Sequence, residues 1–178
     1  MKRKILFVVI LLSVISSFVM AEALFFGTGP EGGAFTRSGG AIGGGVFLGG
    51  EINNQFAIGV KTGFLHDFDD INSLNIQGFV RYQLPLPVDG FFVRADAGVL
   101  MLFYDGETFP VFSGGLAAGW RYNFSQNWFL EPALRFGYPY MWGASLVLGF
   151  RFSPRINNSY SNSHNNSYDN SYIEYEEQ

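Results

Sequence analysis

The feature that most constrains this chain is a two-residue alternation of large apolar side chains with small or polar ones. In the segment 74–84, for example, Ile76 and Val80 fall on one face, while Gln77 and Arg81 fall on the other. A period of two is the signature of a β-strand whose two faces meet different surroundings. Beyond the N-terminal segment, no apolar run reaches the about 20 residues that a membrane-spanning helix needs, so helical spans are not expected.

This alternation predicts seven clear strands and one weaker strand. The clear strands are expected at about 41–52, 56–66, 74–84, 91–104, 111–124, 128–136 and 142–152. Most are about 9–13 residues long, which suits a tilted strand crossing a bilayer, whereas soluble strands are usually about 5–6 residues. The weaker strand runs from Leu24 to about Thr36 and is interrupted by Pro30. We include it because bacterial single-chain barrels have even strand numbers, which leaves both termini in the periplasm.

The polar faces of these strands carry charges that a lipid-facing surface would not tolerate. Arg151, for example, stands between Phe150 and Phe152 at the end of the last strand. In hydrocarbon every backbone N–H and C=O must be paired within the protein, which a closed barrel achieves and an open sheet does not. The sequence therefore predicts an all-β fold, an eight-stranded antiparallel up-and-down transmembrane β-barrel, with its charges in the lumen.

The predicted lumen holds three acids and six bases. They are Glu51, Lys61, Arg81, Arg94, Asp96, Arg121, Glu131, Arg135 and Arg151. Charges inside a membrane protein are costly unless they are paired or hydrated, so we expect a hydrated salt-bridge network. Aromatic side chains gather near both ends of the strands, as expected for residues at the two membrane–water interfaces.

Both ends of the chain differ in composition from the barrel segment, 24–152. A basic start, an apolar stretch at 5–19 and small residues after it predict a signal peptide, 1–23, cleaved after Ala21 or Ala23. An uncleaved membrane anchor is the alternative, although the apolar stretch is short for a span. Residues 153–178 are rich in Asn, Ser and Tyr and predict a disordered periplasmic tail.

Charge and cysteine content narrow the function classes. The chain has no cysteine, so neither a disulfide nor a lipid-anchoring thiol is expected. Its formal net charge of −4 argues against a nucleic-acid partner, which would require a basic face.

The last strand, ASLVLGFRF, places Leu146, Leu148, Phe150 and Phe152 on one face. This pattern resembles the C-terminal insertion signal of outer-membrane barrel proteins, although the tail follows it here. With the predicted signal peptide and strand number, residues 24–152 resemble the small eight-stranded barrels of the OmpA transmembrane-domain and OmpX kind. The resemblance implies an outer-membrane location, contact with outer-membrane lipids, recognition of the last strand by the barrel assembly machinery, and no cofactor or catalytic residue.

Three functions remain open from the sequence. The first is a structural or surface-interaction barrel without catalysis, and the second is a narrow porin-like channel that favours anions. The third is a lipid-modifying barrel enzyme, in which His66 would act with Ser73 or Ser38. In addition, the acidic loops His66–Asp70 and Asp105–Glu107 could hold a divalent cation, and the tail could contact the cell wall or a periplasmic partner.

Overall fold

The computed structural model describes residues 21–35, 39–68 and 71–152. The predicted tail and all but the last three residues of the predicted signal peptide lie outside these ranges. Within them, no helix is long and apolar enough to cross a bilayer.

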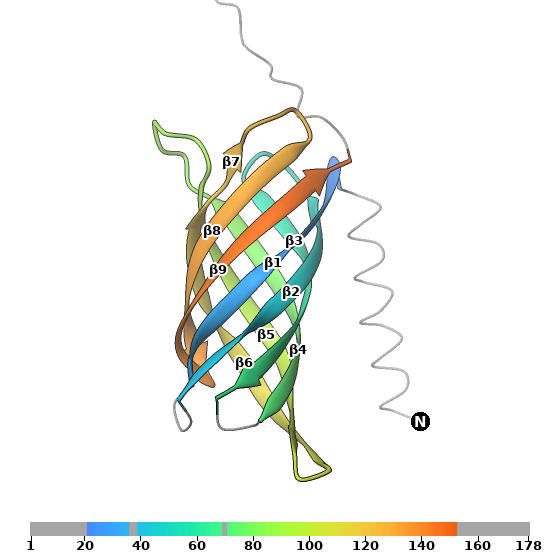
Figure 1. The fold of residues 1–178 in the computed structure, drawn as a ribbon. Helices are drawn as coiled ribbons and strands as arrows, with labels where there is room; N and C mark the ends of the chain where they lie inside the picture. Colours follow the sequence, from blue (N-terminus) through green and yellow to red (C-terminus); the bar gives the residue numbers. More distant parts are fainter. Residues whose placement is uncertain (1–20, 36–38, 69–70, 153–178) are drawn as a thin grey trace, which may run out of the picture.

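Figure 1 shows a closed barrel of tilted strands. The strands are β1 (Ala23–Phe35), β2 (Gly40–Glu51), β3 (Phe56–Asp67), β4 (Asn72–Gln83), β5 (Phe91–Tyr104), β6 (Glu107–Trp120), β7 (Tyr122–Asn123), β8 (Trp128–Tyr138) and β9 (Tyr140–Arg151). Antiparallel pairing runs in chain order from β1 to β6, β8 then pairs with β6 and β7, and β9 pairs with β8 and β1. Because β7 continues the line of β6 after a break at Arg121, the described strands count as eight around the barrel.

The predicted all-β, eight-stranded antiparallel barrel is therefore confirmed, including its weakest strand. β1 crosses the whole wall and pairs with β2 from Ala23↔Glu51 to Ala34↔Gly40. On its other side, the pairing with β9 passes from Thr28↔Leu148 directly to Glu31↔Ser145. Pro30 lies in this gap, and because proline has no backbone N–H it cannot donate to a neighbouring strand.

The hairpin between β5 and β6 differs most from the predicted strand limits. We expected a strand from 111 and a loop before it, but β6 begins at Glu107, paired with Tyr104. Asp105 and Gly106 form the connection, with φ angles of 51° and 78°. Two consecutive residues with positive φ are typical of the type I′ turn, whose twist matches that of paired strands. The two strands therefore remain paired up to the turn.

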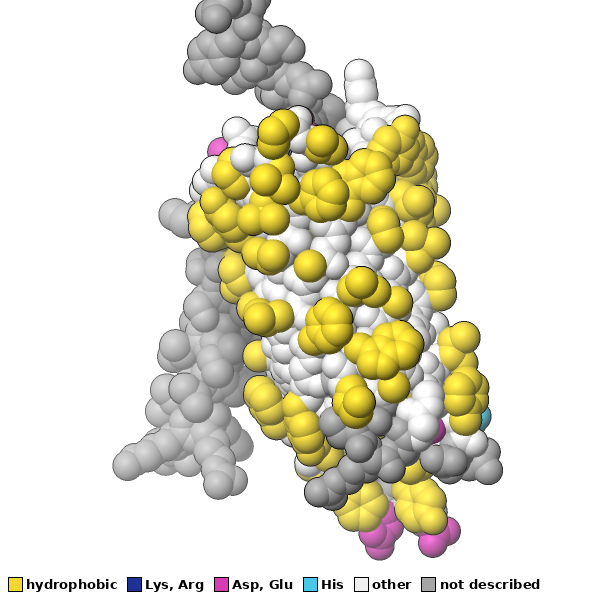
Figure 2. Space-filling model, turned by 90° about the vertical axis from the view of Figure 1, so that its left-hand side faces the viewer, with side chains coloured by type: hydrophobic (Ala, Val, Ile, Leu, Met, Phe, Trp, Pro, Cys, Tyr) yellow, Lys and Arg dark blue, Asp and Glu magenta, His cyan; other side chains and the backbone are white. Residues whose placement is uncertain are grey.

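The two faces of the wall differ as the alternation predicts. Many outward side chains are large, apolar and exposed in the isolated protein, among them Val60 at 39% and Ile76 at 47%. Figure 2 shows hydrophobic side chains spread over one side of the barrel, with acidic side chains only near its ends. The lumen-facing side chains include charged residues that are nearly inaccessible to solvent. The barrel thus has the inside-out polarity that a bilayer requires.

The two ends of the barrel are distinguished by what they carry. One end, called the terminal end here, contains the start of β1, the end of β9 and the turns β2–β3, β4–β5 and β7–β8; it is uppermost in Figure 1. The opposite end, called the loop end, carries the connections β1–β2, β3–β4, β5–β6 and β8–β9.

Candidate functional site

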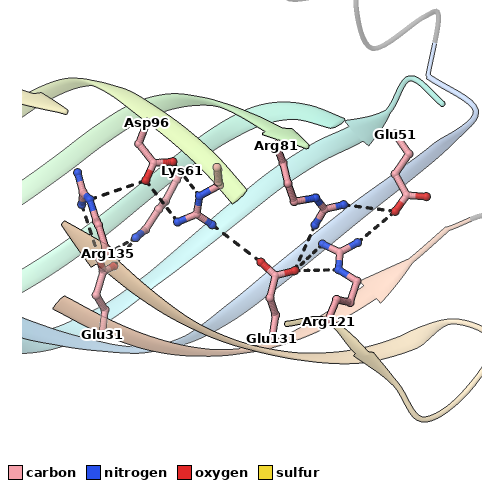
Figure 3. Close-up of polar contacts among 9 residues, drawn as sticks. Glu31, Glu51, Lys61, Arg81, Asp96, Arg121, Glu131 and Arg135 are labelled. Carbon is pink, nitrogen blue, oxygen red and sulfur yellow. Dashed lines mark hydrogen bonds and ion pairs between the residues drawn. The ribbon is translucent and has the colours of Figure 1, made fainter. Parts of the chain in front are cut away.

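The lumen brings the nine sequence-predicted charged residues together. Eight of them, all except Glu51, are at most 7% exposed, and the Glu51 side chain is 19% exposed. Figure 3 shows the lumen charges that it labels in two groups along the barrel axis. The structure adds two buried acids on the lumen face that the sequence analysis did not place there, Glu31 on β1 and Asp67 at the end of β3, which are 9% and 3% exposed. With them, the acids of the described lumen number five against six bases.

Four residues form a closed ring of ion pairs near the terminal end, called the four-residue ring here. Arg81 reaches Glu51 at 3.5 Å and Glu131 at 3.2 Å, while Arg121 reaches the same two carboxylates at 3.1 Å and 2.7 Å. Glu51 ends β2, Arg81 lies on β4, Arg121 lies between β6 and β7, and Glu131 lies on β8. Because these are alternate strands around the barrel, the ion pairs brace the lumen from side to side (Figure 3).

Two further arginines join this ring. Arg151, the last residue of β9, donates from Nη2 to Glu51 Oε1 at 2.9 Å, so a single carboxylate oxygen faces three guanidinium groups. Arg94 Nη1 lies 3.9 Å from Glu131 Oε1 and links the ring to the second group. Arg151 therefore points into the lumen although both its neighbours in sequence are phenylalanines.

The second group lies nearer the loop end and pairs its charges locally. Lys61 Nζ lies 2.7 Å from Glu31, and Arg94 Nε donates to Asp96 Oδ1 at 2.8 Å. Arg135 lies between the two acids, 3.8 Å from Glu31 and 3.7 Å from Asp96. Each acid of this group thus has a cationic neighbour, as buried charges require.

Phenylalanine rings supply further partners for the guanidinium groups of the lumen. Phe25, Phe47, Phe79 and Phe129 form a buried cluster in the lumen. The Arg121 guanidinium carbon lies 3.8 Å from the centroid of Phe129 and 4.6 Å from that of Phe25. A cation over an aromatic face is attracted by the ring quadrupole, and more strongly when water is excluded. The phenylalanine rings and the ion pairs are therefore in contact and together fill the lumen.

Each of the five fully or nearly buried lumen phenylalanines stands directly across from a glycine. The pairs are Phe25↔Gly49, Gly27↔Phe47, Gly59↔Phe79, Phe92↔Gly119 and Phe129↔Gly149. A β-carbon on Gly27 would lie 2.7 Å from the Phe47 ring, and the other four glycines meet their rings as closely or more so. The glycines provide the space that the rings occupy, which accounts for part of the glycine content of the lumen face.

The predicted insertion signal lies on the outer face of β9 and just beyond it. Leu146 and Leu148 are each 44% exposed, and Phe152 is 61% exposed. The Phe150 ring packs edge-on against Trp128, with ring centroids 5.2 Å apart, and against Phe152, with ring centroids 5.5 Å apart. The Phe152 N–H donates to the carbonyl of Leu24 at 2.8 Å, so this segment forms part of the seam where the barrel closes.

His66 and Ser73, one of the two pairs named for lipid-modifying catalysis, do not meet. His66 and Ser73 lie on neighbouring strands, but His66 is exposed on the outer face while Ser73 is buried in the lumen. His66 Nδ1 is 3.1 Å from Asn72 Oδ1, and the Ser73 hydroxyl donates to the carbonyl of Leu65 at 3.3 Å. Ser38 lies outside the described residues.

The predicted divalent-cation loops receive no support from the part of the chain that the structure describes. In that part, no group of three or more His, Cys, Asp or Glu side chains is placed to hold a metal ion. Asp69 and Asp70 lie outside the described residues.

Comparisons with known proteins bear on the fold. No family model matches the chain, and no curated protein matches it. Among solved structures, the outer membrane protein OprG from Pseudomonas aeruginosa is similar with a TM-score of 0.52 at 9% identity, covering 75% of this chain and 97% of OprG. Neisserial surface protein A is similar with a TM-score of 0.50 at 14% identity, covering 72% of this chain and 94% of that protein. The chain has the fold of the small outer-membrane β-barrels.

Proposed function

We propose that this chain is an integral β-barrel protein of an outer membrane, with both termini on the periplasmic side. In this proposal it serves a structural or surface-interaction role and carries no catalysis. The fold that it shares with OprG and Neisserial surface protein A supports the location. The apolar outer face supports residence in lipid, because such a surface would be unfavourable in water over its whole circumference.

The filling of the lumen is the observation that carries the proposed role. Glu131 is 2% exposed, and Phe25 and Phe129 are 0% exposed, although they lie on the inner side of the wall. An aqueous path along the axis would leave such side chains in contact with water. An eight-stranded barrel is about wide enough for its interior to be filled by side chains, and this one is braced across by the four-residue ring. The closed lumen favours the non-conducting role over the narrow channel.

Planar-bilayer recording tests this role. The folded protein, recognised by its heat-modifiable migration on a gel, is added to a lipid bilayer in salt solution. We expect no conductance steps above the lipid background, whereas a porin added to the same bilayer gives steps and validates the assay. Regular steps from the wild-type protein, with anion selectivity, would replace this role with the porin-like channel.

A lumen variant provides the matched comparison. Replacing Phe25 and Phe129 together by Ala removes two rings from the core of the filling. We expect this variant, if its heat-modifiable migration is retained, to conduct intermittently. If the variant conducts and the wild-type protein does not, the phenylalanine rings are what closes the lumen to ions.

A partner for the C-terminal tail belongs to the same proposal. β9 ends at the terminal end, where β1 also begins, so residues 153–178 continue from the side that we assign to the periplasm. We propose that this tail contacts the cell wall or a periplasmic partner. Cosedimentation of the purified protein with isolated cell-wall material, compared with a variant truncated after Phe152, tests the contact, and equal sedimentation of both would exclude it.

A further inference from the structure

The three turns at the terminal end differ sharply in composition. The β2–β3 and β7–β8 turns contain the polar sequences Asn53-Asn54-Gln55 and Ser125-Gln126-Asn127. The β4–β5 turn, 84–90, reads LPLPVDG instead. Its residues Pro85–Asp89 are all exposed, with Leu86 at 46% and Val88 at 58%. Prolines are common in turns, but two large aliphatic side chains at a turn tip are not what contact with water favours, since turns in water usually take Gly, Pro, Asn, Asp or Ser.

The backbone fixes the direction in which this turn leaves the barrel. Gly90 has a φ of 108°, a conformation that favours glycine, and a β-carbon there would lie 2.7 Å from the indole nitrogen of Trp120. The turn is closed by the Leu84 N–H, which donates to the Phe91 carbonyl at 2.9 Å. It is also tied to β6, because the Trp120 indole N–H donates to the Asp89 carbonyl at 2.9 Å. In Figure 1 the turn, drawn in green, projects beyond the barrel and leans away from it.

The turn continues an aromatic strip on the outer face of the wall. Trp120 stacks on Phe91 with ring centroids 6.1 Å apart and lies 5.5 Å from the ring of Tyr122. Phe91 and Tyr122 are 41% and 50% exposed. Tryptophan and tyrosine on the outside of a membrane barrel mark the headgroup level, where one side of the ring is apolar and the other wet. Leu86 and Val88 therefore extend from a residue set at the membrane–water interface.

We propose that the β4–β5 turn is an interfacial anchor, which inserts Leu86 and Val88 into the periplasmic leaflet of the outer membrane. This inference rests on the proposed function, because it requires the barrel to span a bilayer with this end on the periplasmic side. Lipid is the occupant that the structure favours, since the turn is continuous with the lipid-facing wall and leans outward from it. Prolines on both sides of Leu86 restrict the backbone, which reduces the entropy lost when the turn settles in one place.

Site-specific fluorescence tests the anchor in the full-length protein. The chain has no cysteine, so single variants Leu86→Cys and Val88→Cys can each be labelled with the environment-sensitive fluorophore NBD. Gln126→Cys, in a polar turn at the same end, is the matched control. Leu148→Cys, on the outer face of β9, reports insertion of the barrel itself. The folded proteins are placed in vesicles of phosphatidylcholine and phosphatidylethanolamine, with either nitroxide-bearing lipids or iodide on both sides.

The outcomes separate the anchor from the barrel. We expect the nitroxide lipid to quench the labels at Leu86 and Val88 several-fold more than the label at Gln126, and iodide to quench them several-fold less. If both turn labels behave like the label at Gln126 while that at Leu148 is quenched by the lipid, the barrel is inserted and the anchor is wrong. If the label at Leu148 is also open to iodide, the membrane barrel fails, and the anchor fails with it.

Discussion

Phe129 and Gly149 face each other across β8 and β9, and the phenyl ring occupies the space where a side chain at position 149 would stand. Gly149→Ala should therefore overpack the lumen. We expect the free energy of unfolding, measured by guanidinium titration in vesicles, to fall by about 1–3 kcal/mol. Recovery of part of this loss in the double variant Gly149→Ala, Phe129→Leu would trace the effect to the ring.

Gly78 is the matched control for this substitution. It lies on the outer face of β4, where a β-carbon would have no heavy atom nearer than 3.9 Å. Gly78→Ala should leave the free energy of unfolding unchanged or raise it by up to about 1 kcal/mol, because alanine restricts the unfolded chain more than glycine does. Equal losses at Gly78 and Gly149 would contradict the explanation by ring packing.

The four-residue ring predicts a large effect of removing one carboxylate. Glu131→Gln leaves Arg81 and Arg121 buried with one acid between them instead of two. We expect the free energy of unfolding to fall by about 3–5 kcal/mol, the usual loss when one partner of a buried ion pair is removed. The measurement is the same guanidinium titration.

A double-mutant cycle and an exposed acid provide the controls for Glu131. The loss in Glu131→Gln, Arg121→Gln should be smaller than the sum of the two single losses, because each single variant leaves an unpaired partner. Glu107→Gln, at the exposed tip of the β5–β6 hairpin, should change stability by less than about 0.5 kcal/mol. Strict additivity in the cycle would mean that Glu131 and Arg121 are not coupled.

Residence in lipid predicts that the cost of an outward charge depends on its depth. Val60 lies near the middle of β3 on the outer face, and Phe56 begins the same strand. Val60→Arg should lower the free energy of unfolding in vesicles by about 2–4 kcal/mol, and Phe56→Arg by only about 0–1 kcal/mol. If the two substitutions had the same small effect, β3 would not cross hydrocarbon, and the membrane assignment would be in doubt.

The period-two pattern predicted the strands and the inward faces because both depend on local alternation alone. β5 has the predicted limits, 91–104, and Arg151 points inward as expected. Glu31 was missed because Pro30 and the neighbouring glycines hide the alternation in β1. Counting on from Phe25 in steps of two would have placed Glu31 inward, since both residues face the lumen.

Contacts across the lumen could not be predicted in the same way. Which carboxylate meets Arg81 depends on the tilt and stagger of every strand between them, and these are fixed only when the sheet closes. The pairing of Phe129 with Gly149 likewise depends on the register of β8 and β9. The sequence shows many phenylalanines and glycines, and several arginines and carboxylates, but it does not show which residue pairs with which. In similar sequences, a phenylalanine directly across from a glycine on the neighbouring strand could be sought once the strand register is assumed.

The closing seam predicts a specific role for the last aromatic residue. Phe152 packs against Phe150, and its backbone N–H reaches Leu24 on β1. If the barrel assembly machinery reads this end of β9, Phe152→Ala should slow folding several-fold in vesicles that contain the machinery, and little in detergent. Phe124→Ala, which removes a similarly exposed ring at the same end, should not slow it. The measurement is the heat-modifiable folded band over time, and equal slowing of both variants would mean that the machinery does not distinguish Phe152 from other interfacial rings.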